Sequence, residues 1–164
     1  MKSVFVKRHP RRHPMTPEQR VHAAERTLQK LDADGDLGSI CHVLVSDEDS
    51  QVLPPPGGFR KGHCSIVNIE PLDLRDEVEC ATTLFHEAVH VRQIKEHGEK
   101  GIGQEQEIAA HEETIRFLQD WSDRETDRKV WCTENGRQEQ VKDRISEVVA
   151  EERESIRVLR KEGQ

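Results

Sequence analysis

The sequence contains no tyrosine, and aromatic residues make up only 4% of its 164 residues. It also lacks any apolar run near the roughly 20 residues that a membrane-spanning helix needs, and the apolar stretch within residues 1–6 is too short for a secretion signal. The formal net charge of -7 argues against general nucleic-acid binding. We therefore expect a cytoplasmic protein with no membrane segment and no general affinity for nucleic acids.

Cysteine is also sparse, and no two cysteines have the C-x-x-C spacing that is typical of metal or redox sites. The four cysteines are spread along the chain, at Cys41, Cys64, Cys80 and Cys132. Reduced thiols are the default expectation, with two disulfides as the alternative. A second metal site of two cysteines and two histidines around residues 42 and 63 is less favoured, because both residue types are common in ordinary strands.

Charged residues, 35% of the chain, outnumber hydrophobic residues, 33%, which predicts a large share of solvated helix surface. We expect an α+β fold that is mainly helical, with a small edge-exposed β-sheet. Three parts are predicted: a basic flexible tail over residues 1–15, one domain over residues 16–135 and a long C-terminal helix over residues 136–164.

Local signals place the elements of the predicted domain. Thr16-Pro17 together with Gln19 forms a capping-box pattern, which opens a helix that ends near Leu31. Apolar residues bounded by turn signals predict strands over residues 40–46 and 64–70. Apolar residues at helical spacing predict two further helices, one over residues 76–96 and one that ends near Trp121.

The helix over residues 76–96 contains His86-Glu87-Ala88-Val89-His90, an H-E-x-x-H motif. Residues four positions apart on an α-helix lie about 40° apart around the axis and about 6 Å apart along it, so both imidazoles can bind one metal ion. Glu87 lies beside them, where it can accept a proton from the attacking water. The apolar residues gather on the other side, which predicts a buried back and a histidine face that lines a polar cleft.

A catalytic zinc ion usually has three protein ligands, so a third ligand is required. His97 is a poor candidate, because in a continuous helix it lies about 10 Å along the axis from His90. The next helix offers Glu105, Glu107 and His111. Glu107 and His111 lie inside the apolar stripe of that helix, where a carboxylate is costly unless a metal or partner compensates it. Glu105 lies on the solvated side, so the pattern favours Glu107 as the third ligand and His111 as a supporting or catalytic neighbour.

These two stretches resemble the gluzincin zinc metallopeptidases. His86-Glu87-Ala88-Val89-His90 matches the H-E-x-x-H motif, and Glu107-Ile108-Ala109-Ala110-His111 is similar to the E-x-x-A-[D or N] motif that often holds the glutamate ligand on the following helix. The spacing and small size are similar to those of the single-domain members called minigluzincins. The resemblance covers roughly residues 60 to 121, and His111 departs from the Asp or Asn of the family pattern.

The resemblance implies a zinc-dependent peptidase that acts on a peptide or protein substrate. Its zinc ligands would be His86, His90 and Glu107, with Glu87 as the general base and His111 as a further catalytic residue. Related enzymes pair an extended substrate with an edge strand in the region that corresponds here to residues 64–70.

Stabilisation of the oxyanion is a separate question, because related enzymes often use tyrosine or histidine for it and this chain has no tyrosine. The candidates that remain are His111, His97, His63 and Arg92. Two other hypotheses stay open. The chain could be a binding or regulatory protein that keeps zinc only for stability. Alternatively, the motif is coincidental, with two surface histidines and a Glu107 that pairs with a base such as His111.

The C-terminal helix is predicted from about Arg137 to Arg160, with a narrow apolar seam that Glu152 interrupts. This seam either packs on the domain or forms a contact with a partner or a second copy of the chain, since the helix is longer than a small domain is wide. The sequence does not separate these two alternatives.

Overall fold

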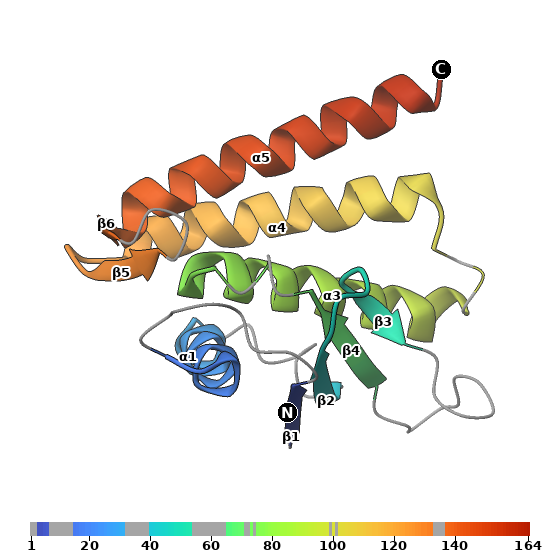
Figure 1. Ribbon diagram of the computed structural model, residues 1–164. Coiled ribbons are helices and arrows are strands. Elements are labelled where there is room, and N and C mark those ends of the chain that lie inside the picture. Colours follow the sequence, from blue (N-terminus) through green and yellow to red (C-terminus); the bar gives the residue numbers. More distant parts are fainter. Residues whose placement is uncertain are drawn as a thin grey trace.

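The computed structural model describes residues 3–6, 15–31, 40–53, 65–70, 73, 75–98, 100, 102–132 and 137–164. These parts of the chain form a mostly helical fold with a small sheet and a long C-terminal helix (Figure 1). The predicted α+β class is therefore confirmed. None of the helices in these ranges is both long and apolar enough to cross a membrane.

A four-stranded sheet forms one layer of the molecule, in the order β1-β2-β4-β3. Its strands are β1 (Ser3–Val6), β2 (Ile40–Val45), β3 (Gln51–Leu53) and β4 (Ser65–Ile69). β1 and β4 run parallel to β2, whereas β3 runs antiparallel to β4. Val43 and Val45 of β2 and Val67 and Ile69 of β4 are fully buried, so the sheet has an apolar face on which the helices pack.

Two strands differ from the sequence-based prediction. Ser3–Val6 pairs with β2 at the edge of the sheet, although a flexible tail was predicted there, and Val4 packs against the core while Phe5 stays exposed. Residues 7–14 of that predicted tail lie outside the described residues. The strand expected at the edge, β4, is an inner strand, because the unpredicted β3 pairs with its other side. β3 has only three residues, which is too short for an alternating pattern.

The long helices pack in layers against one another and the sheet. α1 (Pro17–Lys30) packs on α3 (Glu77–His97), α4 (Gln104–Arg124) lies on α3, and α5 (Val141–Glu162) lies on α4 (Figure 1). The predicted capping box of α1 is present, with Thr16 and Gln19 bonded in both directions. Asp76 caps α3 by accepting the backbone N–H of Glu79 at 2.9 Å.

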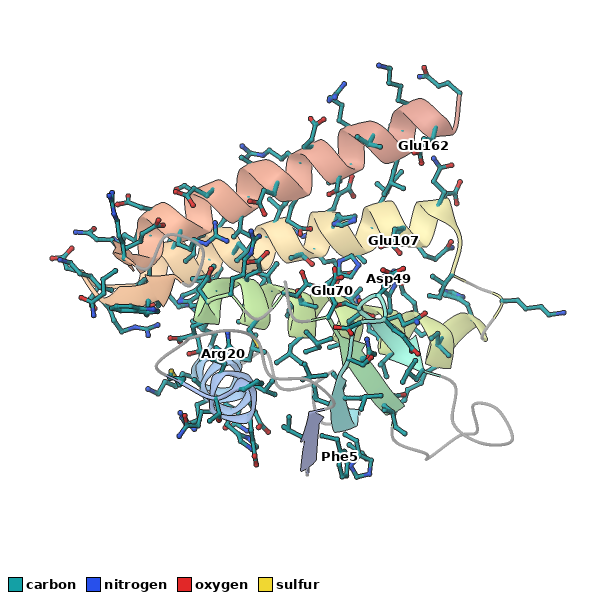
Figure 2. All side chains as sticks on the ribbon, in the orientation of Figure 1. Phe5, Arg20, Asp49, Glu70, Glu107 and Glu162 are labelled. Atoms are coloured by element: carbon teal, nitrogen blue, oxygen red, sulfur yellow. The ribbon has the colours of Figure 1, made fainter. Side chains whose placement is uncertain are left out.

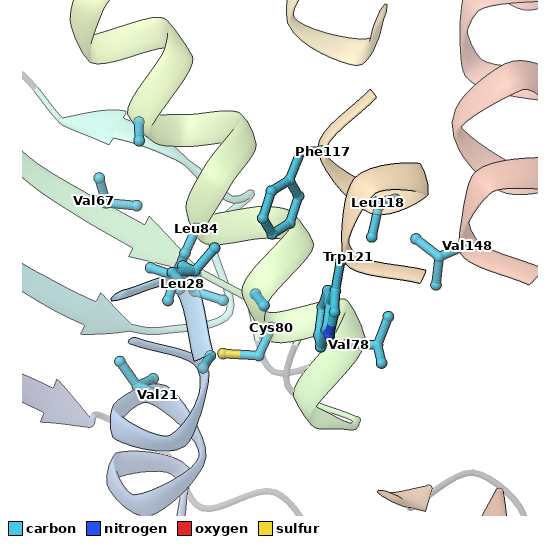
Figure 3. Close-up of a cluster of buried hydrophobic side chains, with 14 of the residues drawn as sticks. Val21, Leu28, Val67, Val78, Cys80, Leu84, Phe117, Leu118, Trp121 and Val148 are labelled. Atoms are coloured by element: carbon cyan, nitrogen blue, oxygen red, sulfur yellow. The ribbon is translucent and has the colours of Figure 1, made fainter. Parts of the chain in front are cut away.

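The core lies around α3, where this helix meets the sheet, α1 and α4 (Figure 3). α3 contributes Val78, Cys80 and Leu84, and α4 contributes Phe117, Leu118 and Trp121. α3 is buried on nearly every side, which explains why its polar residues also need partners inside the protein.

The apolar seam of α5 belongs to the same core. Val141, Ile145, Val148 and Val149 are buried there against the rest of the chain. These seam residues therefore pack within the chain, which is the first of the two alternatives. The exposed side of α5 is mostly charged, although Val158 is 40% exposed.

The start of the C-terminal helix also differs from the prediction, which placed it at about Arg137. β5 (Lys129–Cys132) and β6 (Arg137–Gln140) form an antiparallel pair, and the helix begins only at Val141. Val130 of β5 is buried, whereas Trp131 is 39% exposed. No residue before Val141 belongs to the apolar seam of α5. A helix over residues 137–140 would therefore bury no apolar side chain against the core.

The cysteines do not all follow the default expectation of reduced thiols. Cys80 is free and buried in the core. Cys41 is disulfide-bonded, so its thiolate is not available for the second metal site considered above. His63 and Cys64, the other half of that site, lie outside the described residues.

Candidate metal centre

The two histidines of the H-E-x-x-H motif lie on the side of α3 that faces α4. His86 is 9% exposed and His90 is 6% exposed, so the hypothesis that they are surface histidines is wrong. The histidine face is also more closely covered than the expected polar cleft, because α4 packs directly on it. Their Nε2 atoms lie 2.9 Å apart, so the two rings direct these nitrogens toward the same position.

Glu107 of α4 completes this group. Its Oε1 lies 3.0 Å from Nε2 of His86, and its Oε2 lies 2.9 Å from Nε2 of His90. The three side chains together offer three ligand atoms close enough to hold one metal ion. Figure 2 shows Glu107 on α4, the helix that runs over α3. Glu105, the alternative on the same helix, is exposed and does not belong to this group.

The charges of this group support one another. Burial alone would raise the pKa of the Glu107 carboxyl, but hydrogen bonds and charge from His86 and His90 hold that pKa well below its usual range. Burial alone would lower the pKa of His90, but the hydrogen bond and charge of Glu107 raise it overall. An anionic oxygen pair facing two imidazoles is a donor set suited to a divalent cation such as zinc.

Glu87 lies next to His86 but has a separate environment. Its side chain is 5% exposed, and its carboxylate accepts a hydrogen bond from the backbone N–H of Val52 on β3. Its Oε2 is buried and has no hydrogen-bond partner within the described parts of the chain. Burial raises the pKa of Glu87 to about 7, although the charge of His90 opposes this shift. Glu87 is therefore a carboxyl group that can exchange a proton near neutral pH.

His111 lies on α4 one turn after Glu107. Its Nε2 is 3.7 Å from Oε1 of Glu107, and its ring centroid is 4.6 Å from that of His86. Its other nitrogen, Nδ1, contacts Oε2 of Glu152 on α5. His111, Glu152 and His86 form a second group that offers three ligand atoms near one another. The structure thus places His111 beside the candidate metal centre, together with Glu152.

The other candidates for oxyanion stabilisation do not share this position. His97 is exposed near the end of α3, where its Nε2 lies 3.7 Å from Glu96. Arg92 pairs with the carboxylate of Glu113 on α4 at 2.5 Å. His63 lies outside the described residues.

Four residues near the centre were not assigned a role from the sequence. Oε1 of Gln93 accepts a hydrogen bond from Nδ1 of His90 at 2.8 Å, and its place three residues after that histidine was the only indication in the sequence. In the sequence, Glu152 only interrupted the apolar seam of the C-terminal helix, with no indication of its partner. Val52 acts through its backbone, which leaves no sequence signal. Asp73 has a pKa raised by burial and interacts electrostatically with both Glu152 and His86.

Comparison with known proteins adds no relative to this description. The chain matches no protein-family model, no curated protein and no solved structure. Function must therefore be argued from the site alone.

Proposed function

We propose that the chain is a zinc-dependent metallopeptidase of the gluzincin type, with His86, His90 and Glu107 as metal ligands. The observation that carries this proposal is the convergence of the three side chains. The two Nε2 atoms lie 2.9 Å apart, and the two carboxylate oxygens of Glu107 lie 3.0 Å from Nε2 of His86 and 2.9 Å from Nε2 of His90. Nitrogen and oxygen ligands at about 2.0–2.2 Å from a tetrahedral zinc ion lie about 3.3 Å apart. After a small outward shift the three side chains would hold zinc, which would also bind water or substrate.

Zinc at this position would supply a Lewis acid that polarises the scissile carbonyl and lowers the pKa of water. Glu87 is the residue proposed to handle protons. Val52 holds its carboxylate, and Oε2, which has no hydrogen-bond partner among the described residues, can accept the proton of the attacking water. A pKa of about 7 suits a group that must then pass the same proton to the leaving amine.

A peptide is the proposed substrate class because of the neighbouring sheet edge. β3 pairs with β4 on one side and with no described strand on the other. Val52 of β3 donates to Glu87, so this edge adjoins the proposed general base. An extended chain can add to such an edge through backbone hydrogen bonds. The resemblance to gluzincins implied this role for an edge strand, and β3 takes the place first expected for β4.

The rival hypothesis is a protein that keeps the same zinc site only for stability or partner binding. Glu87→Gln separates the two, because it removes the base and no metal ligand. We expect the variant to keep its zinc and to lose at least about 100-fold in hydrolysis of a mixed peptide library. Glu96→Gln, an exposed change on the same helix, should keep both properties. Zinc-loaded wild-type protein that cleaves no peptide, or equal cleavage by Glu87→Gln, would contradict the proposal.

A further inference from the structure

Glu152 occupies an unusual place for a charged residue. It interrupts the apolar seam of α5 between Val149 and Ile156, both of which are buried, and its side chain is only 15% exposed. A carboxylate buried among apolar neighbours costs free energy unless a partner compensates it. An aliphatic side chain would fit the pattern of the seam better. The carboxylate must therefore have another use.

The partner of Glu152 is His111, which in turn faces the metal centre. Oε2 of Glu152 contacts Nδ1 of His111, so this nitrogen carries the proton that the carboxylate accepts. His111 is 14% exposed, and its other nitrogen lies 3.7 Å from Glu107. Its ring also lies against that of His86. Glu152 thus fixes the orientation of a ring that touches two of the three proposed ligands.

His86 is the ligand that lacks support of its own. A metal-binding histidine normally donates its second ring N–H to an oxygen or another acceptor, which fixes the ring and its tautomer. His90 has Gln93 in this role, at 2.8 Å. Nδ1 of His86 is buried and has no hydrogen-bond partner within the described ranges. His111 and Glu152 each offer an atom near the ring of His86.

We propose that Glu152 is a positioning residue for the metal centre and acts through His111. Glu152 holds His111, and His111 supports His86 and Glu107 from the side that Gln93 does not reach. The C-terminal helix is then part of the centre and more than a packing element. This inference rests on the metal site of the proposed function, but it does not depend on peptide hydrolysis.

The test compares Glu152→Met and Glu152→Gln with Glu151→Met and Glu151→Gln, a matched exposed pair on the same helix. Zinc affinity is measured by competition with a chelator, and the tautomer of His111 by ¹⁵N NMR. We expect Glu152→Met to lower zinc affinity about 10- to 100-fold and to abolish the preference of His111 for Nδ1–H. Glu152→Gln keeps an oxygen acceptor and should lose less. Both Glu151 variants should match the wild type.

A stability measurement separates positioning from packing. Methionine fits the apolar seam, so metal-free Glu152→Met should unfold at the same or a higher denaturant concentration than the metal-free wild type. Weaker zinc binding in a variant of undiminished stability would support the proposal. Unchanged zinc affinity together with an unchanged His111 tautomer would overturn it. Two zinc ions in the wild type and one in Glu152→Met would also overturn it, because Glu152 would then be a ligand itself. Absence of hydrolysis would affect only the proposed function.

Discussion

Oε1 of Gln93 lies 2.8 Å from Nδ1 of His90. The amide of Gln93 is oriented by a second bond, in which its Nε2 donates to the backbone oxygen of Gln106 at 3.0 Å. Its oxygen must then accept from His90, so Nδ1 of His90 carries a proton and Nε2 is the nitrogen that would bind a metal ion. Gln93 therefore links α3 and α4 and places a proton on Nδ1 of one proposed ligand.

We expect Gln93→Leu to lower zinc affinity about 10-fold without unfolding the protein, because it removes this acceptor from a ligand histidine. Chelator competition measures the change. Gln119→Leu, the same substitution on the exposed side of α4, serves as the control and should bind zinc like the wild type. Equal affinity in both variants would show that His90 needs no support from Gln93.

The raised pKa of Glu87 predicts a pH-dependent stability in protein stripped of metal. The folded chain binds the proton of Glu87 up to about pH 7, whereas the ordinary pKa of a glutamate is 4.5. The folded state thus holds more protons than the unfolded state between these values. The contribution of Glu87 to the free energy of unfolding is therefore fully present below about pH 4.5, and it is lost as the pH rises through about 7.

The glutamine side chain in Glu87→Gln stays neutral at every pH, so the stability of this variant should not fall in this way. We expect metal-free Glu87→Gln to be up to about 3 kcal/mol more stable than the metal-free wild type at pH 8, and nearly equal to it at pH 4.5. Urea unfolding at the two pH values measures the difference. A gap of the same size at both values would mean that Glu87 does not titrate as described.

Arg144 of α5 joins two buried carboxylates at the start of α3. Its Nε donates to Asp76 at 2.8 Å, and its Nη2 donates to Glu79 at 3.1 Å. Arg144 is 4% exposed and Asp76 is fully buried. We expect Arg144→Met to lower the free energy of unfolding by about 3 kcal/mol, because it leaves buried charges without their partner.

The control for this prediction is Arg157→Met, which removes an exposed arginine of the same helix that pairs with Glu154. Its effect should stay below about 0.5 kcal/mol. Chemical denaturation of both variants provides the comparison. A small effect at Arg144 would mean that Arg75, which also binds Glu79, is sufficient to compensate this cluster.

The sequence predicted the features that depend on a long periodic pattern. The helices of residues 77–97 and 104–124 were found close to their expected limits, since each has many apolar residues at helical spacing. The same spacing distinguished Glu107 from Glu105, and the structure brings the first toward the histidines and leaves the second exposed.

Short or distant features were beyond this kind of prediction. β1, β3 and the β5–β6 pair have three or four residues per strand, which is too few to show alternation, and they form because a neighbouring strand is present. Glu152 lies 41 positions from His111, and Val52 acts through its backbone alone. Only the packing of α5 on α4 and of β3 beside α3 brings these groups together.

The metal content of purified variants tests the central claim most directly. We predict about one zinc ion per chain in the wild type, loss of that zinc in both His86→Ala and Glu107→Ala, and full retention in Glu105→Ala, whose side chain is exposed on the same helix as Glu107. Elemental analysis after dialysis gives the answer. Zinc retained by Glu107→Ala, or a wild-type chain that binds none, would contradict the assignment of this centre.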